Sequence, residues 1–285
     1  MIKSRSIAVS LAFAVLATGF STASFAAGDA IKIERQKWSF SGIMGEYDSK
    51  QLQRGFGVYK EVCAACHGLS RIAFRNLAQP GGPEFNAEQV KALAATYEVP
   101  DEPNEDGEVN PRPARLADRF PPLYANEQAA RASQNGALPP DLSVIAKARG
   151  VAYTGSWYAH PFAMLKDIVT AYQEGGADYL YALMTGYKAA PAGEKVPDGM
   201  NYNAAYPGHM IAMAAPLSDG LDVYNDGTPE TADNYARDVA AFLSWTSDPT
   251  LNQRKRSGWV VMVFLLITSI LLYVSKRRIW ASVKH

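Results

Sequence analysis

The segment Cys63-Ala-Ala-Cys66-His67 constrains this chain of 285 residues more than any other feature. Two cysteines three positions apart lie on one face of a helical turn, so both sulfurs can form thioethers with the vinyl groups along one porphyrin edge. His67 follows directly and is then carried under the iron as the proximal ligand. The motif therefore predicts one haem c, covalently bound through Cys63 and Cys66 and ligated by His67.

Two other chemistries use paired cysteines. A thioredoxin-like redox pair shares the spacing but does not need the adjacent histidine. A common structural zinc site needs a second pair of ligands, and Cys63 and Cys66 are the only cysteines in the chain. Haem attachment is therefore preferred to both, and the folded domain must be held by packing and by its cofactor.

Residues 1–26 have the pattern of a secretory signal peptide. Two basic residues precede an apolar run from Ile7 to Phe20, and Ser24-Phe25-Ala26 matches a small-x-small cleavage site. A transmembrane anchor is the alternative, but this apolar run is short for crossing a bilayer. Export agrees with the haem motif, because bacterial c-type haem is attached on the periplasmic side.

A second apolar run lies near the C-terminus. Gly258 to Ser275 contains eighteen uncharged residues, with Trp259 and Tyr273 near its ends. This length and the terminal aromatics are typical of a membrane-spanning helix, and the basic residues on both flanks argue against a buried core helix. Four basic residues follow the run (Lys276, Arg277, Arg278 and Lys284), which predicts a cytoplasmic C-terminus.

These segments predict the organisation of the chain. A signal peptide (1–26) is followed by a periplasmic cytochrome c domain (27–253), a transmembrane anchor with basic flanks (254–280) and a cytoplasmic tail (281–285). The predicted location is a bacterial inner (cell) membrane, crossed once. The anchor also makes membrane lipid a predicted partner.

The formal net charge of zero hides an acidic exported body. Without the two basic residues of the signal and the seven from Arg254 onward, 19 Lys and Arg face 28 Asp and Glu, a formal charge of −9. Six acidic residues lie between Glu98 and Glu108 with no basic residue among them. A solvated loop is one interpretation, and a patch that steers a basic partner is the other. The same sign disfavours a nucleic-acid partner.

Hydrophobic periodicity and breaker residues predict a mainly α-helical body with long loops and few strands. Eight prolines and several glycines make the stretch 78–126 mostly irregular. Helices are expected in four places: from a cap at Asp48-Ser49 into Cys63, near 87–97, over 140–148 and over 231–246.

The iron needs a sixth ligand or an open site for catalysis. Met213 lies in a non-helical, proline-ended stretch, 209–217, which can lay a thioether across the distal face of the haem. Met210 and His209 are too near in sequence to be excluded by spacing. Thioether ligation raises the reduction potential and suits an electron carrier, whereas an open iron would indicate a peroxidase or a gas sensor.

An ordered set of segments carries a specific resemblance. Besides the haem motif it consists of Arg54–Cys63, Pro103–Glu108, Asn135–Ser143, Tyr179–Tyr187, Met213–Leu217, Tyr224–Pro229 and Asp238–Trp245. From about Phe40 to Trp280 the chain resembles the cytochrome c1 family in its bacterial form. Members of this family are the membrane-anchored haem subunits of ubiquinol–cytochrome c reductase, the bc1 complex.

The resemblance implies a fold and further site residues. The fold is the class I cytochrome c fold, whose crossing first and last helices would bring Gly55 and Gly57 against Phe242 and Trp245. The sixth ligand becomes Met213, and Arg149 becomes a contact of a haem propionate, although the residues alone equally indicate a surface helix end there. The remaining cofactor-binding candidates lie in the family's haem-packing segment, namely Asn135 and Pro140.

The implied function is electron transfer in a respiratory or photosynthetic chain, from a Rieske iron–sulfur protein to a cytochrome c docking near Glu98–Glu108. The implied partners include cytochrome b, in a dimeric complex, and the chain is not an enzyme on its own. Two alternatives stay open: an electron-entry subunit of a periplasmic dehydrogenase or a haem peroxidase, and a largely structural assembly subunit. An insertion at 151–175, rich in aromatic residues and containing His160, departs from the compact members of the family. It is expected to be a surface embellishment, with a second ligand site as the alternative.

Overall fold

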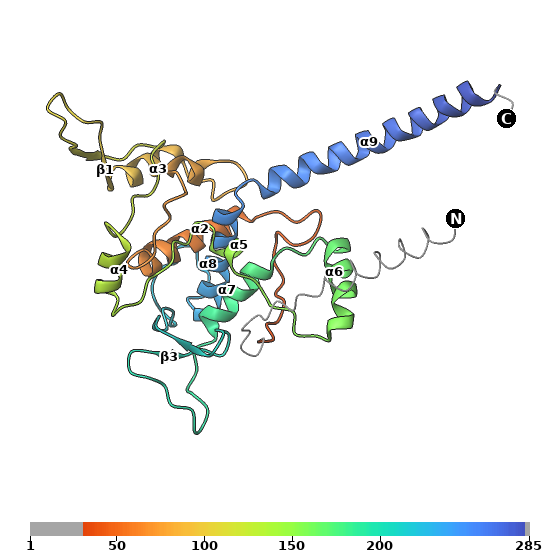
Figure 1. Ribbon diagram of the computed structural model, residues 1–285. Coiled ribbons are helices and arrows are strands. Elements are labelled where there is room, and N and C mark those ends of the chain that lie inside the picture. Colours follow the sequence, from red (N-terminus) through yellow and green to blue (C-terminus); the bar gives the residue numbers. More distant parts are fainter. Residues whose placement is uncertain (1–30, 283–285) are drawn as a thin grey trace, which may run out of the picture. The chain divides into compact units, whose positions relative to one another are not determined.

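The computed structural model describes residues 31–282 (Figure 1). The predicted signal peptide and the last three residues of the tail lie outside the described residues. Regular structure in the described part is mostly helical, and its two sheets are two-stranded antiparallel hairpins. The predicted mainly α-helical class is therefore confirmed.

The first described helix, α2 (Ser49–Val58), leads into the haem motif. The carboxylate of Asp48 caps it by accepting from the backbone N–H groups of Lys50 at 2.9 Å and Gln51 at 3.3 Å. A π-helical turn, Tyr59–Cys63, continues the same axis. Such turns are rare and often occur at functional sites, and this one ends at the first cysteine of the motif.

The last helix of the body, α8 (Ala232–Ser247), packs across α2. A Cβ atom added to Gly55 would overlap the backbone carbonyl of Asp238 and lie 2.7 Å from the Cβ of Phe242. The crossing of first and last helices is thus as expected, but only Gly55 lies in it. Gly57 instead faces Val223, and the ring of Trp245 packs against Gly82.

Helix α7 (Gly175–Thr185) also packs on α8, and α5 (Ile145–Ala148) contacts both. On α7, the buried carboxylate of Asp178 accepts from Trp38 Nε1 at 2.8 Å and from the backbone N–H of Gln36 at 2.9 Å. These bonds hold the segment before α2 against the core. The prediction of a helix over 140–148 is wrong in its first half, because Asp141 caps the N–H of Ser143 and the helix begins only at Ile145.

The remaining elements are short. Helix α3 (Ala87–Ala94) forms where the 87–97 helix was expected, with Asn86 as its cap. The others are η2 (Phe74–Ala78), α4 (Glu127–Ser133), η3 (Trp157–Ala159), α6 (His160–Val169), the β1–β2 hairpin (Glu98–Pro100, Pro111–Pro113) and the β3–β4 hairpin (Asn201–Tyr202, Met210–Ile211).

The chain ends in a single long helix, α9 (Leu251–Trp280), which is long and apolar enough to cross a membrane. Its first turns are bonded to the loop 40–46 of the body. The ammonium group of Lys255 donates to the carbonyls of Phe40 at 2.7 Å and Gly45 at 3.0 Å, and Arg256 pairs with Glu46 at 2.7 Å. The predicted C-terminal apolar helix is confirmed, and it begins seven residues before Gly258.

Candidate haem site

The two cysteines of the motif lie on one helical turn, as the spacing predicted. The backbone N–H groups of Cys66 and His67 donate to the carbonyl of Cys63 at 3.1 and 2.9 Å. Both thiols are free and half-buried. Burial raises the pKa of the Cys63 thiol to about 12. A redox pair depends on a lowered cysteine pKa, so this environment argues against thiol exchange.

His67 is held with one ring nitrogen occupied. Its Nδ1 lies 2.8 Å from the carbonyl oxygen of Pro140. A carbonyl only accepts, so Nδ1 carries the proton and Nε2 keeps its lone pair for a metal. Burial lowers the pKa of His67 and so also favours the neutral ring. The phenol of Tyr59 donates to the carbonyl of His67 at 2.9 Å, which fixes the backbone as well.

Pro140 is brought to the motif by its own segment, 139–143. The backbone N–H of Leu142 donates to the Gly68 carbonyl at 2.9 Å, and the carboxylate of Asp141 accepts from the N–H of Ser70 at 2.8 Å. The Ser143 hydroxyl accepts from the N–H of Arg71 at 3.0 Å. Pro140 therefore acts through its main-chain carbonyl, not as the start of a helix.

Met213 lies on the loop that follows β4. Its side chain is half-buried against the hydrophobic core. Its carbonyl accepts from the phenol of Tyr187 at 3.1 Å and from the Asn201 amide at 3.4 Å. The other candidates nearby are engaged locally: Met210 is paired with Tyr202 in the β3–β4 hairpin, and the ring of His209 stacks on that of Tyr202, with centroids 5.4 Å apart.

Arg149 lies within electrostatic reach of Tyr179 on α7. It ends α5, is exposed, and its charge opposes the rise in pKa that burial causes at Tyr179. Tyr179 in turn adds to the rise in the pKa of Tyr187, which burial takes to about 12. Asn135 is exposed in a left-handed turn, φ 49°, and in the described part of the chain no contact joins it to the other site residues.

Tyr59 and Tyr187 were not among the site residues predicted from the sequence. Tyr59 could have been found, because it stands four positions before Cys63 and thus on the same face of the helix. Tyr187 follows α7 by two residues, and its role depends on a contact across 26 positions. No local pattern signals such a contact.

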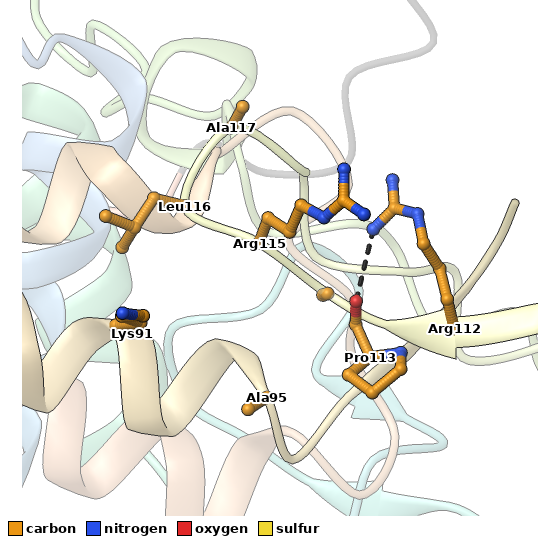
Figure 2. A pocket seen from close by; sticks show the side chains of 8 residues that line it. Lys91, Ala95, Arg112, Pro113, Arg115, Leu116 and Ala117 are labelled. Atoms are coloured by element: carbon orange, nitrogen blue, oxygen red, sulfur yellow. Dashed lines mark hydrogen bonds between the residues drawn. The ribbon is translucent and has the colours of Figure 1, made fainter.

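A separate cavity of about 570 Å³, shown in Figure 2, lies beside the β1–β2 hairpin. It is lined by Lys91, Ala95 and residues 112–117, and no predicted haem-site residue is among them. Its Arg112 pairs with Asp118 at 2.6 Å and with Asp101 at 3.0 Å. One of the six acids between Glu98 and Glu108, Asp101, is therefore paired with a basic residue where the loop of the hairpin begins.

The residues present fit a c-type haem. Cys63 and Cys66 supply two sulfurs on one helical turn, His67 presents Nε2, and Met213 offers a thioether from a loop. Helices α2 and α8 cross, and the haem motif follows directly from the first of them. Together these two features define a protein of the c-type cytochrome class, which here has an additional apolar C-terminal helix.

Comparison with known proteins identifies the family. Residues 38–283 match the Cytochrome C1 family, and the chain belongs to it. It is 48% identical to cytochrome c1 of Blastochloris viridis over 250 residues, 87% of this chain and 86% of that protein. The mitochondrial cytochrome c1 haem protein of Schizosaccharomyces pombe is 42% identical over 87% of this chain and 72% of its own length.

A further relative is longer. The protein named cytochrome b/c1 in Bradyrhizobium diazoefficiens is 49% identical over 86% of this chain but only 35% of its own length. The chain therefore spans about a third of that relative. The resemblance to a bacterial cytochrome c1, inferred from ordered motifs, is confirmed.

Proposed function

We propose that this chain is the electron-transfer subunit of a quinol–cytochrome c reductase, the bc1 complex, and carries one covalent haem c. The observation that carries the proposal is His67, whose Nδ1 is fixed by the Pro140 carbonyl so that Nε2 is available to an iron. Membership of the cytochrome c1 family supports the same role.

The proposed haem contacts divide between two sides. Cys63 and Cys66 would form the thioethers, His67 and Met213 would ligate the iron, and Arg149 would pair with a propionate. When bound, haem c supplies one-electron redox chemistry at a potential raised by Met/His ligation. The chain's own residues orient and shield the ligands, and no general acid, base or nucleophile is required of them. The chain is therefore not an enzyme on its own.

The proposed electron donor is a Rieske iron–sulfur protein, whose His-ligated cluster has a raised potential. The proposed acceptor is a cytochrome c. The exposed acids of the β1–β2 hairpin support a docking site for a basic acceptor: Glu98, Glu102, Glu105, Asp106 and Glu108. Such a patch raises the association rate at low salt. Neutralising these five residues should flatten the salt dependence of cytochrome c reduction, and an unchanged dependence would exclude this docking site.

Assembly with cytochrome b in a dimeric complex is also part of the proposal. The name of the Bradyrhizobium relative, cytochrome b/c1, supports this partner. Helix α9 is proposed to anchor the chain once in the bacterial inner membrane, with the haem domain in the periplasm and the basic C-terminal end in the cytoplasm.

Gentle solubilisation of the membrane and purification through this chain test the whole proposal. A b-type haem and a Rieske cluster should co-purify, and the preparation should reduce cytochrome c with a quinol. Purification with a dehydrogenase or with peroxidase activity instead would contradict the proposal. The matched control is a His67→Ala chain. Its preparation should lose the absorbance of the c-type haem, and the b-type haem and the Rieske cluster are measured in it in the same way.

A further inference from the structure

An ordinary surface helix turns its apolar face toward the body of the protein, but helix α6 exposes its apolar face. None of its ten residues is buried, although it is rich in large apolar side chains. Phe162 is 74% exposed, Leu165 58% and Val169 68%. These positions, spaced by three and four, form one face. Just before the helix, Trp157 is 86% exposed. We call this surface, 157–169, the α6 apolar face.

The side of α6 that lies against the body is small and polar. Ala159, Ala163 and Asp167, four residues apart, are the partly covered positions. Asp167 accepts from Arg35 at 2.8 and 3.0 Å, and the guanidinium of Arg35 lies 3.6 Å from the ring centre of Tyr172. The helix is thus held in place by a polar seam. These contacts fix the orientation of the helix, so its apolar side faces outward.

The α6 apolar face adjoins the region where the anchor begins. Gly42 lies next to the carbonyl of Thr170, the residue that ends α6. Its loop, 40–46, is the same loop that binds Lys255 and Arg256 in the first turns of α9. The segment that follows α6 reaches α9 too, through a 3.4 Å bond from Arg254 to the Gln173 side chain.

These contacts place the insertion level with the start of the membrane span. Lys255 and Arg256 stand within one turn of Gly258, where the uncharged run begins, so they fall at the height of lipid headgroups. The loop 40–46 presents two further exposed apolar side chains there, Ile43 at 54% and Met44 at 73%. Aromatic residues such as Trp157 and Tyr158 favour this interfacial depth.

We infer that α6 is an interfacial helix: the α6 apolar face, together with Ile43 and Met44, lies in the headgroup region of the bilayer that α9 crosses. Lys166 is exposed between Phe162 and Val169 on the helix surface, where its ammonium can reach anionic phosphates while its stem covers apolar surface. The insertion then acts as a second membrane contact that fixes the tilt of the body on its single anchor.

The occupant is lipid because the segment that follows α6 contacts the first turns of the helix that enters lipid, both directly through Gln173 and through the loop 40–46. An exposed apolar surface of this kind marks either a membrane contact or a protein contact. A protein partner covering the patch is the competing arrangement, and the experiment separates the two. The inference does not depend on the haem chemistry or on the identity of the electron donor.

Spin labels on single introduced cysteines test it. Ile168→Cys and Leu165→Cys place a label on the α6 apolar face, and Val109→Cys, 54% exposed in the acidic hairpin, is the matched control. With haem attached, Cys63 and Cys66 do not react. The full chain, with whatever subunits co-purify, is reconstituted in vesicles of phosphatidylcholine and phosphatidylglycerol. Collision rates with oxygen and with a water-soluble nickel chelate are then measured.

At positions 165 and 168 the ratio of oxygen to nickel collisions should be several-fold higher than at position 109. An equal ratio at all three positions would mean that the face is in water and would overturn the inference. Low collision rates with both reagents at 165 and 168 would mean that protein covers the face, and would overturn it as well. An unchanged haem spectrum confirms folding, and two labelled positions guard against a local effect of one substitution.

Discussion

The two sides of the candidate haem site are built in different ways. On the His67 side, the ring is bonded to the Pro140 carbonyl, the backbone to Tyr59, and the motif follows directly from a helix packed in the core. On the Met213 side, a loop is held by two side-chain bonds to one carbonyl, from Tyr187 and Asn201. The first side is therefore part of a packed helix, whereas the second is a loop in which these two bonds supplement the core contacts of a half-buried Met213.

This difference matches what each side has to do. Thioethers and a proximal histidine must be presented in one fixed register, so they are best placed at the end of a packed helix. A thioether ligand only has to reach the iron, so a loop is sufficient, and the strength of that contact can be set by the bonds that hold the loop. Damage to the first side should therefore affect folding, and damage to the second should affect the potential.

The largest effect should come from the helix crossing that supports the His67 side. Gly55→Val places a branched side chain where even a Cβ overlaps the Asp238 carbonyl. We expect the free energy of unfolding to fall by about 3 kcal/mol or more, since neither backbone can move without opening the core. Chemical denaturation measures this. Gly57→Ala is the control, because its Cβ would meet only a Val223 methyl at 3.3 Å. Equal losses would contradict the role given to the crossing.

On the other side, Met213→Leu should change the redox potential more than stability. Loss of the thioether removes the proposed ligand, which favours ferrous iron, and we expect the midpoint potential to fall by on the order of 0.1–0.2 V. A redox titration followed by haem absorbance measures it. Met210→Leu, three residues away in β4, should leave the potential unchanged. If the midpoint potential falls in Met210→Leu and not in Met213→Leu, then Met210, and not Met213, is the sixth ligand.

Much of the fold was predictable because its signals are local. Capping residues at Asp48 and Thr231 marked the starts of α2 and α8, and the uncharged run after Gly258 marked α9. Prediction went wrong where a side chain bonded across the chain. Asp141 looked like a helix start, yet its carboxylate accepts from the N–H groups of Ser70 and Ser143, and the helix begins only at Ile145.

The candidate site shows the same division. Spacing alone identified Cys63, Cys66 and His67, since their chemistry depends on neighbours in sequence. The Pro140 carbonyl bond and the Tyr187 bond join residues 73 and 26 positions apart, and only tertiary structure creates them. The outward apolar face of α6 was likewise unpredicted, because periodicity shows that a helix has two faces but not which one meets the body.

A smaller effect is expected for the bond that holds the Met213 loop. Tyr187→Phe removes the phenol that donates to the Met213 carbonyl at 3.1 Å and leaves the ring in place. The methionine ligation should weaken by about 1 kcal/mol, the usual net contribution of one hydrogen bond. Added imidazole competes with the methionine for the iron, and its binding measures the strength of the methionine ligation. A loss of about 1 kcal/mol corresponds to a rise of about fivefold in the apparent affinity for imidazole. Tyr158→Phe, at an exposed position, is the control, and an unchanged affinity at position 187 would show that packing alone holds the loop.

The smallest effect is expected at Asp141, on the His67 side. Burial by itself would raise the pKa of this carboxyl, but hydrogen bonds from Ser143 and Ser70 outweigh it, and the pKa is lowered. A lowered pKa means that the charged form stabilises the fold above the unfolded-state pKa of about 4, and that this contribution is lost as the pH falls below that value. Asp141→Asn should therefore cost roughly 0.5 kcal/mol at neutral pH and progressively less in acid, because the single amide oxygen keeps one of the two bonds and gives up the other, and the bond from Ser70 is exposed, which puts its loss at the low end of the usual range. Denaturation curves at several pH values measure the difference, with Asp106→Asn in the exposed hairpin as the control. If the loss of unfolding free energy does not shrink in acid, the charge of Asp141 does not stabilise the segment 139–143. Side-chain packing would then be the only difference between the two sides of the site.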